Sequence, residues 1–579
     1  MTRTTPEGAA DNPRTSILRA LCVGVWFALA GALFLLATPP GSAPDEASHF
    51  ARVAGLVSGS LFGDELAWDS WAFRDKPHTP QWDRVRRESG GYSVDPKFLY
   101  LSSNQAYCNV QQPDVPACLV GAGDPPWLAD PDKQVSGHAR TQPLPYFVPA
   151  LFSSVGWSER STFYLARLGM LAQCAALMGA AFWCFLRATR GRSERTALAA
   201  LALSLTPLAV SFSGVLSPSA IETVGAIALA MVTWSVLVAA EVRTSARTLW
   251  VVALAFAVLS RSIGLAFGAL AVVGATWCAG EGLKTLARRL GAWPLAVAAP
   301  IATAALLWDP MFKANLRPTV STFDSSAAIS DLDQVWQNTI DVSDHFGWLD
   351  TVMPLPLRAG ILLLAFWVLV ASALLSSRGW ARRLTMLVLL YLVIGVVMSR
   401  GLQPTGFGMQ ARFLLPGFGA IVVVCGLRLV VEGPVAEAAA RLGLVFPLVA
   451  LAYLTASVVV LRRHVVGMSG PVWFWGDGAF RPPGGWLIYG LVALAFVGWT
   501  LWLTLAVRGP GSLDMGRVLV ADPLVVGDAG DLAAQAGLGL VPDQGAVEAL
   551  RGPRGGVEDA GGPEGVHDLA VGRRADELT

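Results

Sequence analysis

The amino-acid sequence predicts an all-α integral membrane protein with about twelve transmembrane helices and a large extracytoplasmic loop after the first. Hydrophobic residues make up 54% of the 579 residues and charged residues only 15%, against about 25% charged residues in soluble globular chains. Long apolar runs, such as 361–375 and 384–398, approach the ~17–25 residues that span a bilayer. This composition excludes a soluble enzyme, a disordered scaffold and a secreted disulfide domain. The net charge of +1 gives no indication of nucleic-acid binding.

The first apolar run, 21–37, follows several arginines and is ended by Pro39 and Pro40. We therefore expect an uncleaved first span with a cytoplasmic N-terminus, residues 1–17. Segment 249–278 is interrupted by Arg261 and has basic residues on both flanks, which predicts a hairpin of two short helices with Arg261 near its tip. Further spans are expected at about 163–186, 196–212, 220–240, 292–308, 357–375, 384–398, 413–430, 444–461 and 486–507.

These spans define a polytopic membrane domain, residues 18–507. Short basic loops mark the cytoplasmic side, so the long loops 41–142, 309–356 and 462–485 are expected together on the extracytoplasmic side. After Trp502 the chain has no aromatic residue, which predicts a disordered cytoplasmic tail over 508–579.

Two of the seven cysteines, Cys108 and Cys118, sit together in a polar segment, whereas the other five lie in apolar runs. In an extracytoplasmic loop this pair predicts a disulfide. No cluster of histidines and cysteines has zinc-site spacing, and no cofactor is indicated. Asp124, Asp130 and Asp132 match no calcium loop and leave the question of a divalent cation open.

The strongest candidate for chemistry directly follows the first span. Ser42 and Asp45 have the spacing of a capping box, which predicts a helix that presents Asp45, His49 and Arg52 on one face. An acid, an imidazole and a guanidinium would then point together at the membrane surface. The alternative is that Asp45 and Glu46 only complement the positive end of a helix.

Charged residues at the ends of later spans form a second group of candidates. Glu222 begins an apolar span, where a carboxylate is costly unless it is paired or wet. It either lines a cavity or lies at the lipid headgroups. Arg261 either faces water or an anion, or reaches the membrane surface. Arg400 and Arg412 lie on the side that disfavours positive charge, which suggests either a bound anion such as a lipid phosphate or contact with headgroups.

Four segments in this order resemble a bacterial family of predicted multi-pass membrane proteins of unknown function, over roughly residues 20–430. The first is a P-D-E-x-S-H-F-x-R stretch at 44–52. The second is P-L-x-Y-x-x-P-A-L at 143–151, with Pro145 where an aromatic residue is common. A turn at 216–219 follows, in which Ser219 replaces the usual acid, and then Q-x-R-[YF]-x-L-P at 410–416.

The layout also resembles the GT-C glycosyltransferases, which take sugars from polyprenyl-phosphate carriers outside the cytoplasmic membrane. In that superfamily an acid in the first outer loop is the usual catalytic carboxylate, and Asp45 or Glu46 occupies that place. The resemblance implies transfer of a sugar, with inversion, from a polyprenyl-phosphate donor to an extracytoplasmic cell-envelope glycan in the bacterial plasma membrane. The residues expected to contact the substrates are His49, Arg52, Glu222, Arg261, Arg400, Gln410 and Arg412.

Two rival functions stay open. A transporter or flippase of lipid-linked glycans would place ionisable residues in mid-membrane, whereas here they gather at the outer ends of the spans. A non-catalytic partner in envelope assembly would use the outer loop to bind protein.

Overall fold

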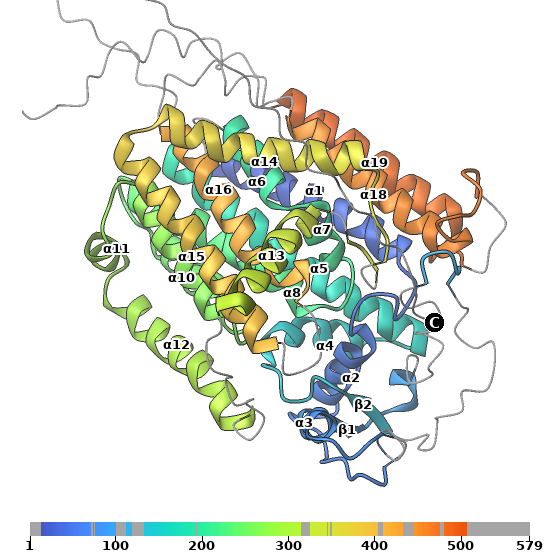
Figure 1. The fold of residues 1–579 in the computed structure, drawn as a ribbon. Helices are drawn as coiled ribbons and strands as arrows, with labels where there is room; N and C mark the ends of the chain where they lie inside the picture. Colours follow the sequence, from blue (N-terminus) through green and yellow to red (C-terminus); the bar gives the residue numbers. More distant parts are fainter. Residues whose placement is uncertain are drawn as a thin grey trace, which may run out of the picture. The chain divides into compact units, whose positions relative to one another are not determined.

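The described residues form mainly helices, together with two short strands (Figure 1). The predicted all-α membrane class is confirmed. All described residues belong to one unit of the chain, Met1–Met515. The computed structural model describes residues 13–70, 73, 76–99, 112–117, 133–190, 194–313, 325–343, 345–347, 350–402, 409–431, 445–474 and 480–506. Cys108, Cys118 and the predicted tail at 508–579 lie outside these ranges.

Eight helices in the described ranges are long and apolar enough to cross a membrane. They are α1 (Pro13–Ala37), α5 (Glu159–Thr189), α8 (Pro218–Val238), α12 (Ala292–Lys313), α14 (Leu355–Leu375), α15 (Arg378–Leu402), α18 (Val445–Val466) and α19 (Gly485–Ala506). Two bent pairs raise the number of candidate spans to ten. These pairs are α6 (Glu194–Ser204) with α7 (Pro207–Ser213), and α10 (Gly264–Cys278) with α11 (Leu283–Leu290).

Each of the twelve predicted spans contains helix, but α9 (Thr244–Val258) and α16 (Leu415–Val431) are too short to count among the eight to ten candidate spans. The number of crossings therefore stays a prediction. The predicted pair of short helices is confirmed, because α9 and α10 are separate and Arg261 lies between them. The predicted span 196–212 is not one straight helix. Pro207 starts a new helix after the Thr206 cap, and the two halves meet at 76°.

The core surrounds α8, which packs against α5, α9, α10 and α16. In the most apolar stretch of α8, 94% of the residues are buried inside the protein, whereas in that of α12 only 6% are buried. Small residues allow α1 and α5 to approach closely. A Cβ added at Gly24 would lie 3.1 Å from the carbonyl oxygen of Ala175, and one at Gly179 would lie 3.0 Å from that of Ala20. Such contacts between small residues are typical of helices that pack in membranes.

The segment that follows α1 begins with α2 (Glu46–Val57). The strands β1 (Gly90–Ser93) and β2 (Lys133–Ser136) pair antiparallel and lie beside α2, with α3 (Pro80–Glu88) next to them in Figure 1. On the other side α2 packs on α4 (Phe147–Ser154). Ser136 donates a hydrogen bond of 2.7 Å to the carbonyl of Ser48. This bond fixes the turn after β2 over the first turn of α2.

Candidate functional site

The turn between α1 and α2 differs from the predicted capping box. Helix α2 begins at Glu46, and its N-cap Asp45 has a left-handed backbone with φ 62° and makes no side-chain cap. Left-handed residues other than glycine are uncommon, although aspartate tolerates the region better than most. The prediction of a Ser42–Asp45 box is therefore wrong. The carboxylate of Asp45 turns away from the helix end and is available to another partner.

Glu46 is locked in a buried ion pair. Both Glu46 and Arg167 of α5 are 0% exposed. Arg167 donates to the two carboxylate oxygens at 2.7 and 2.6 Å, and the backbone N–H groups of Gly41 and Leu216 donate to them at 3.0 Å. The same guanidinium also binds the carbonyls at the end of α1, including that of Thr38 at 2.6 Å. These contacts make Glu46 a cross-link between α1, α5 and the turn before α8.

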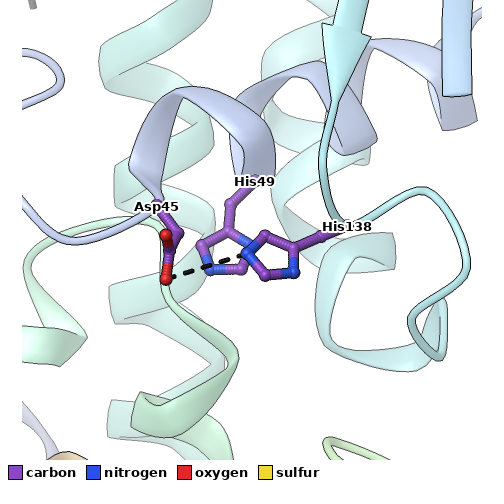
Figure 2. A group of neighbouring side chains, drawn as sticks. All are labelled: Asp45, His49 and His138. Carbon is purple, nitrogen blue, oxygen red and sulfur yellow. Dashed lines mark ion pairs between the residues drawn. The ribbon is translucent and has the colours of Figure 1, made fainter. Parts of the chain in front are cut away.

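Asp45 lies in a more open cluster. Arg412, in η7 (Ala411–Phe413), donates a 2.6 Å hydrogen bond to Asp45 Oδ2. Asp45 and His138 keep about a third of their side-chain surface exposed, and His138 Nε2 lies 3.7 Å from the same oxygen. The rings of His49 and His138 stack with centroids 4.5 Å apart (Figure 2). Asp45, His49 and His138 each offer a ligand atom, and these atoms lie within 4.8 Å of one another, so the three could hold a metal ion.

Tyr146 of η3 (Leu144–Tyr146) sets the orientation of His49. The Tyr146 hydroxyl and His49 Nδ1 lie 2.9 Å apart, and both side chains are buried. The hydrogen bond occupies one ring nitrogen and leaves Nε2 on the opposite edge of the ring. The Pro-rich segment 143–149 thus contributes to the site through a buried tyrosine.

Arg261 brings a second guanidinium to the cluster. It donates a 2.9 Å hydrogen bond to the hydroxyl of Ser219 and lies 3.7 Å from Glu222. Its guanidinium carbon lies 4.2 Å from the ring centroid of Phe413, and that of Arg412 lies 5.2 Å from the same centroid. The hairpin link, the start of α8 and η7 therefore meet around one aromatic ring. Neither carboxylate oxygen of Glu222 has a hydrogen-bond partner among the described residues.

The surroundings set the charge of the two central residues. Burial would raise the pKa of Asp45, but the Arg412 guanidinium and attraction from His138 outweigh it and hold this pKa well below its usual range. Burial lowers the pKa of His49 well below its usual range, and repulsion from His138 acts in the same direction. At neutral pH the site therefore contains a carboxylate next to a neutral imidazole, with two guanidiniums close by.

Two predicted substrate residues point elsewhere. Arg52 does not face Asp45. It is 0% exposed and donates 3.0 Å hydrogen bonds to the Tyr92 hydroxyl and the Thr141 carbonyl. Arg400 pairs with Asp331 of α13 (Ser325–Ile340). The predicted common face of Asp45, His49 and Arg52 is wrong for Arg52, because its long side chain reaches the sheet instead.

Gln410 is the N-cap of η7, and its side-chain oxygen is buried without a hydrogen-bond partner among the described residues. Its predicted contact with substrate stays a prediction. The described cysteines, Cys22, Cys174, Cys184, Cys278 and Cys425, are free and buried, as expected from their apolar surroundings.

Sequence patterns did not single out His138 or Arg167, whereas Tyr146 lies in the Pro-rich stretch at 143–151 that forms part of the family resemblance. Arg167 carried a usable signal, because an arginine inside an apolar helix needs a partner. His138 lies five residues before the Pro-rich segment and shows no periodic pattern that would place it. The pairing of β1 with β2 and the hydrogen bond from Ser136 to Ser48 together bring it to Asp45.

Comparison with known proteins adds the family. None of the curated proteins matches this sequence. A family model does match and covers most of the chain. The matched stretch includes Asp45, His49, His138, Arg261 and Arg412, and it ends inside α16. The chain belongs to the family of predicted membrane proteins DUF2142, which it matches over residues 27–418.

Proposed function

We propose that the protein is a membrane glycosyltransferase of the GT-C type that transfers a sugar from a polyprenyl-phosphate carrier to a cell-envelope glycan. The observation that carries the proposal is the contact between Asp45 and Arg412 at 2.6 Å, in a partly exposed cluster that also holds Arg261. The carboxylate can accept a proton, and the two guanidiniums beside it can bind a phosphate. Both are needed when a hydroxyl displaces a sugar phosphate.

Asp45 is the proposed general base. The acceptor hydroxyl oxygen attacks the anomeric carbon, and its proton passes to the Asp45 carboxylate. The bond between the anomeric carbon and the phosphate oxygen breaks, and the electron pair leaves with the polyprenyl phosphate. A single displacement of this kind inverts the configuration at the anomeric carbon. Glu46 is the weaker candidate, because four donors already occupy its oxygens.

Arg412 and Arg261 are the proposed phosphate ligands. While Arg412 holds Asp45, the low pKa of Asp45 makes it a weak proton acceptor. An anionic donor competes for the Arg412 guanidinium, and its arrival would leave Asp45 with a stronger affinity for protons. Binding of the donor would thus switch on the base. Glu222, 3.7 Å from Arg261, would help to hold that arginine in place.

The proposed setting is the bacterial plasma membrane, with the site on the extracytoplasmic side and both termini in the cytoplasm. The apolar helices, which are long enough to cross a bilayer, place the chain in a membrane. The site residues lie at helix ends and in the segments that join helices, so a lipid-linked donor could keep its tail in the bilayer while its sugar meets water. The same arrangement would let a glycan acceptor approach from outside.

The decisive experiment compares Asp45→Asn with Asp83→Asn in purified protein supplied with polyprenyl-phosphate sugars and cell-envelope glycan. Asp83 binds Arg86 and Arg87 on the surface of α3, away from the site, and serves as the matched control. We expect Asp45→Asn to lower transfer by about 10²–10⁴-fold and Asp83→Asn to leave it unchanged. Transfer at the wild-type rate by Asp45→Asn would overturn the proposal. Flux of lipid-linked sugar across vesicles without glycoside formation would favour a flippase instead.

A further inference from the structure

The stacked histidines beside Asp45 have a use that the proposed reaction does not require. We propose that Asp45, His49 and His138 bind one divalent transition-metal ion, with zinc as the best fit. Their ligand atoms come from the N-cap of α2, its first turn and the turn after β2, and lie within 4.8 Å of one another (Figure 2). Within the described residues, this is the group of three such side chains that the fold brings together.

The donor set selects the type of ion. Two imidazoles and one carboxylate suit zinc and its neighbours in the first transition row, whereas magnesium and calcium prefer oxygen ligands alone. Three protein ligands also leave a fourth position open, as in catalytic zinc sites. An open position next to Arg261 and Arg412 could accept an oxygen of an anionic ligand.

A neighbouring tyrosine orients one of the ligands, as metal sites require. Tyr146 holds Nδ1 of His49, so Nε2 is the nitrogen that would bind metal. Nε2 of His138 already faces Asp45 at 3.7 Å. Zinc–nitrogen bonds of about 2.0–2.1 Å need ligand atoms roughly 3.4 Å apart, so the widest separation in the site, up to 4.8 Å, must shrink by about 1.4 Å. His138 sits in a turn and is a third exposed, which gives it room to move and gives the ion access from water.

Arg412 is the competitor for the site. It holds Asp45 Oδ2 at 2.6 Å, and a cation bound to that oxygen would repel the guanidinium. Metal binding would therefore release Arg412 from Asp45, but the bound cation would itself keep Asp45 from accepting a proton, so the ion would inhibit the transfer proposed above. Only this last link, the effect of the ion on transfer, rests on the proposed function. The metal site itself depends on the geometry of three side chains.

The test titrates metal-free, full-length protein in detergent with Co²⁺ and Zn²⁺, and follows the visible absorption of cobalt and the heat of zinc binding. We expect one ion per chain. His138→Ala and His49→Ala should abolish binding, and His78→Ala should preserve it, because His78 stacks on Trp68 outside the cluster. If His49→Ala does not fold, His138→Ala decides the result, since His138 is more exposed. Absence of binding by the wild type, or unchanged binding by His138→Ala, would overturn the proposal.

Two further variants separate a metal site from a chance cluster. Tyr146→Phe removes the hydrogen bond between the Tyr146 hydroxyl and His49 Nδ1, and it should weaken metal binding about 10–100-fold. Arg412→Gln removes the competitor and should tighten binding. Weaker binding by Arg412→Gln, or no change with Tyr146→Phe, would contradict the site as described.

The metal site and the proposed function can fail separately. Sugar transfer by a protein that binds no ion would overturn the metal site and leave the transferase intact. Stoichiometric zinc binding by a protein that transfers no sugar would preserve the metal site and overturn the transferase.

Discussion

Two consecutive acids, Asp45 and Glu46, form ion pairs of the same length and opposite character. Each carboxylate lies 2.6 Å from an arginine nitrogen. The Glu46–Arg167 pair is 0% exposed, whereas the Asp45 side chain is 32% exposed and that of Arg412 is 8% exposed. The distance between the charges therefore says little about their role. Burial and the number of other donors decide whether an ion pair holds the fold or stays available for chemistry.

The difference follows from how the chain turns between α1 and α2. Glu46 is the first residue of α2 and points into the core, where the end of α1 and the turn before α8 supply donors. Asp45 precedes it with a left-handed backbone and points to η7. One peptide unit thus separates a structural acid from the acid that we propose for catalysis.

The largest expected effect is on the buried pair. Glu46→Gln leaves the Arg167 charge in the core without a counter-ion, which should cost about 3–5 kcal/mol of stability. Thermal unfolding in detergent would measure the loss, with Asp45→Asn as the matched control at the neighbouring position. A melting temperature equal to that of the wild type would show that Glu46 is not the cross-link described above.

The next effect concerns the open pair. Arg412→Gln should raise the KM for the lipid-linked donor about tenfold or more, since a hydrogen bond to a charged group contributes roughly 1.5–3 kcal/mol. Its melting temperature should change much less than that of Glu46→Gln. The measurement is steady-state transfer at varied donor concentration. An unchanged KM would show that Arg412 does not bind the donor phosphate. The Asp45–Arg412 pair would then differ less from the structural Glu46–Arg167 pair.

Arg52 tests whether the contacts of α2 with β1 and with the segment after β2 stabilise the fold. Arg52→Met keeps an unbranched apolar stem, although a shorter one, and removes the hydrogen bonds to Tyr92 and Thr141. We expect a loss of about 1–3 kcal/mol, because buried acceptors lose their donors. Tyr92→Phe removes only the first of these bonds and should cost less. Thermal unfolding of both variants measures whether Arg52→Met is the less stable of the two. Equal stability of Arg52→Met and the wild type would refute the prediction.

The smallest expected effect on stability is at Glu222. Glu222→Gln removes a charge that lies 3.7 Å from Arg261 and has no hydrogen bond among the described residues. The melting temperature should therefore stay close to the wild-type value. Transfer should fall if Glu222 holds Arg261 in place, and Glu222→Asp should recover part of it. Collapse of the fold in Glu222→Gln would instead place Glu222 with Glu46 among the structural acids.

Much of the helical layout could be predicted from sequence because apolar runs and basic loops are local signals. The pair of short helices around Arg261 was predictable for this reason. Arg412 stood out in the sequence as a charge in an unusual place, but nothing paired it with Asp45, because 367 residues separate the two. Arg400 was selected for the same reason, but it pairs with Asp331. The partner lies on α13, which packs against α15 and was not predicted from the sequence.

The details of the site depended on signals that are not local. The sequence pattern could not show that Asp45 adopts a left-handed backbone, because the competing partner, Arg412, comes from a distant segment. His138 reaches the site through strand pairing in a polar loop whose register follows no hydrophobic alternation. Side chains placed by such long-range contacts require the structure.

The left-handed backbone of Asp45 has a consequence for mutational libraries at this position. Glycine and asparagine fit the φ of 62° most readily, whereas valine and isoleucine would be strained whatever their surroundings. A selection for folded protein alone would thus enrich Gly, Asn and Asp together. A selection that also demands activity would keep Asp alone, so the two enrichment profiles, compared at one codon, would separate what the turn needs from what the chemistry needs.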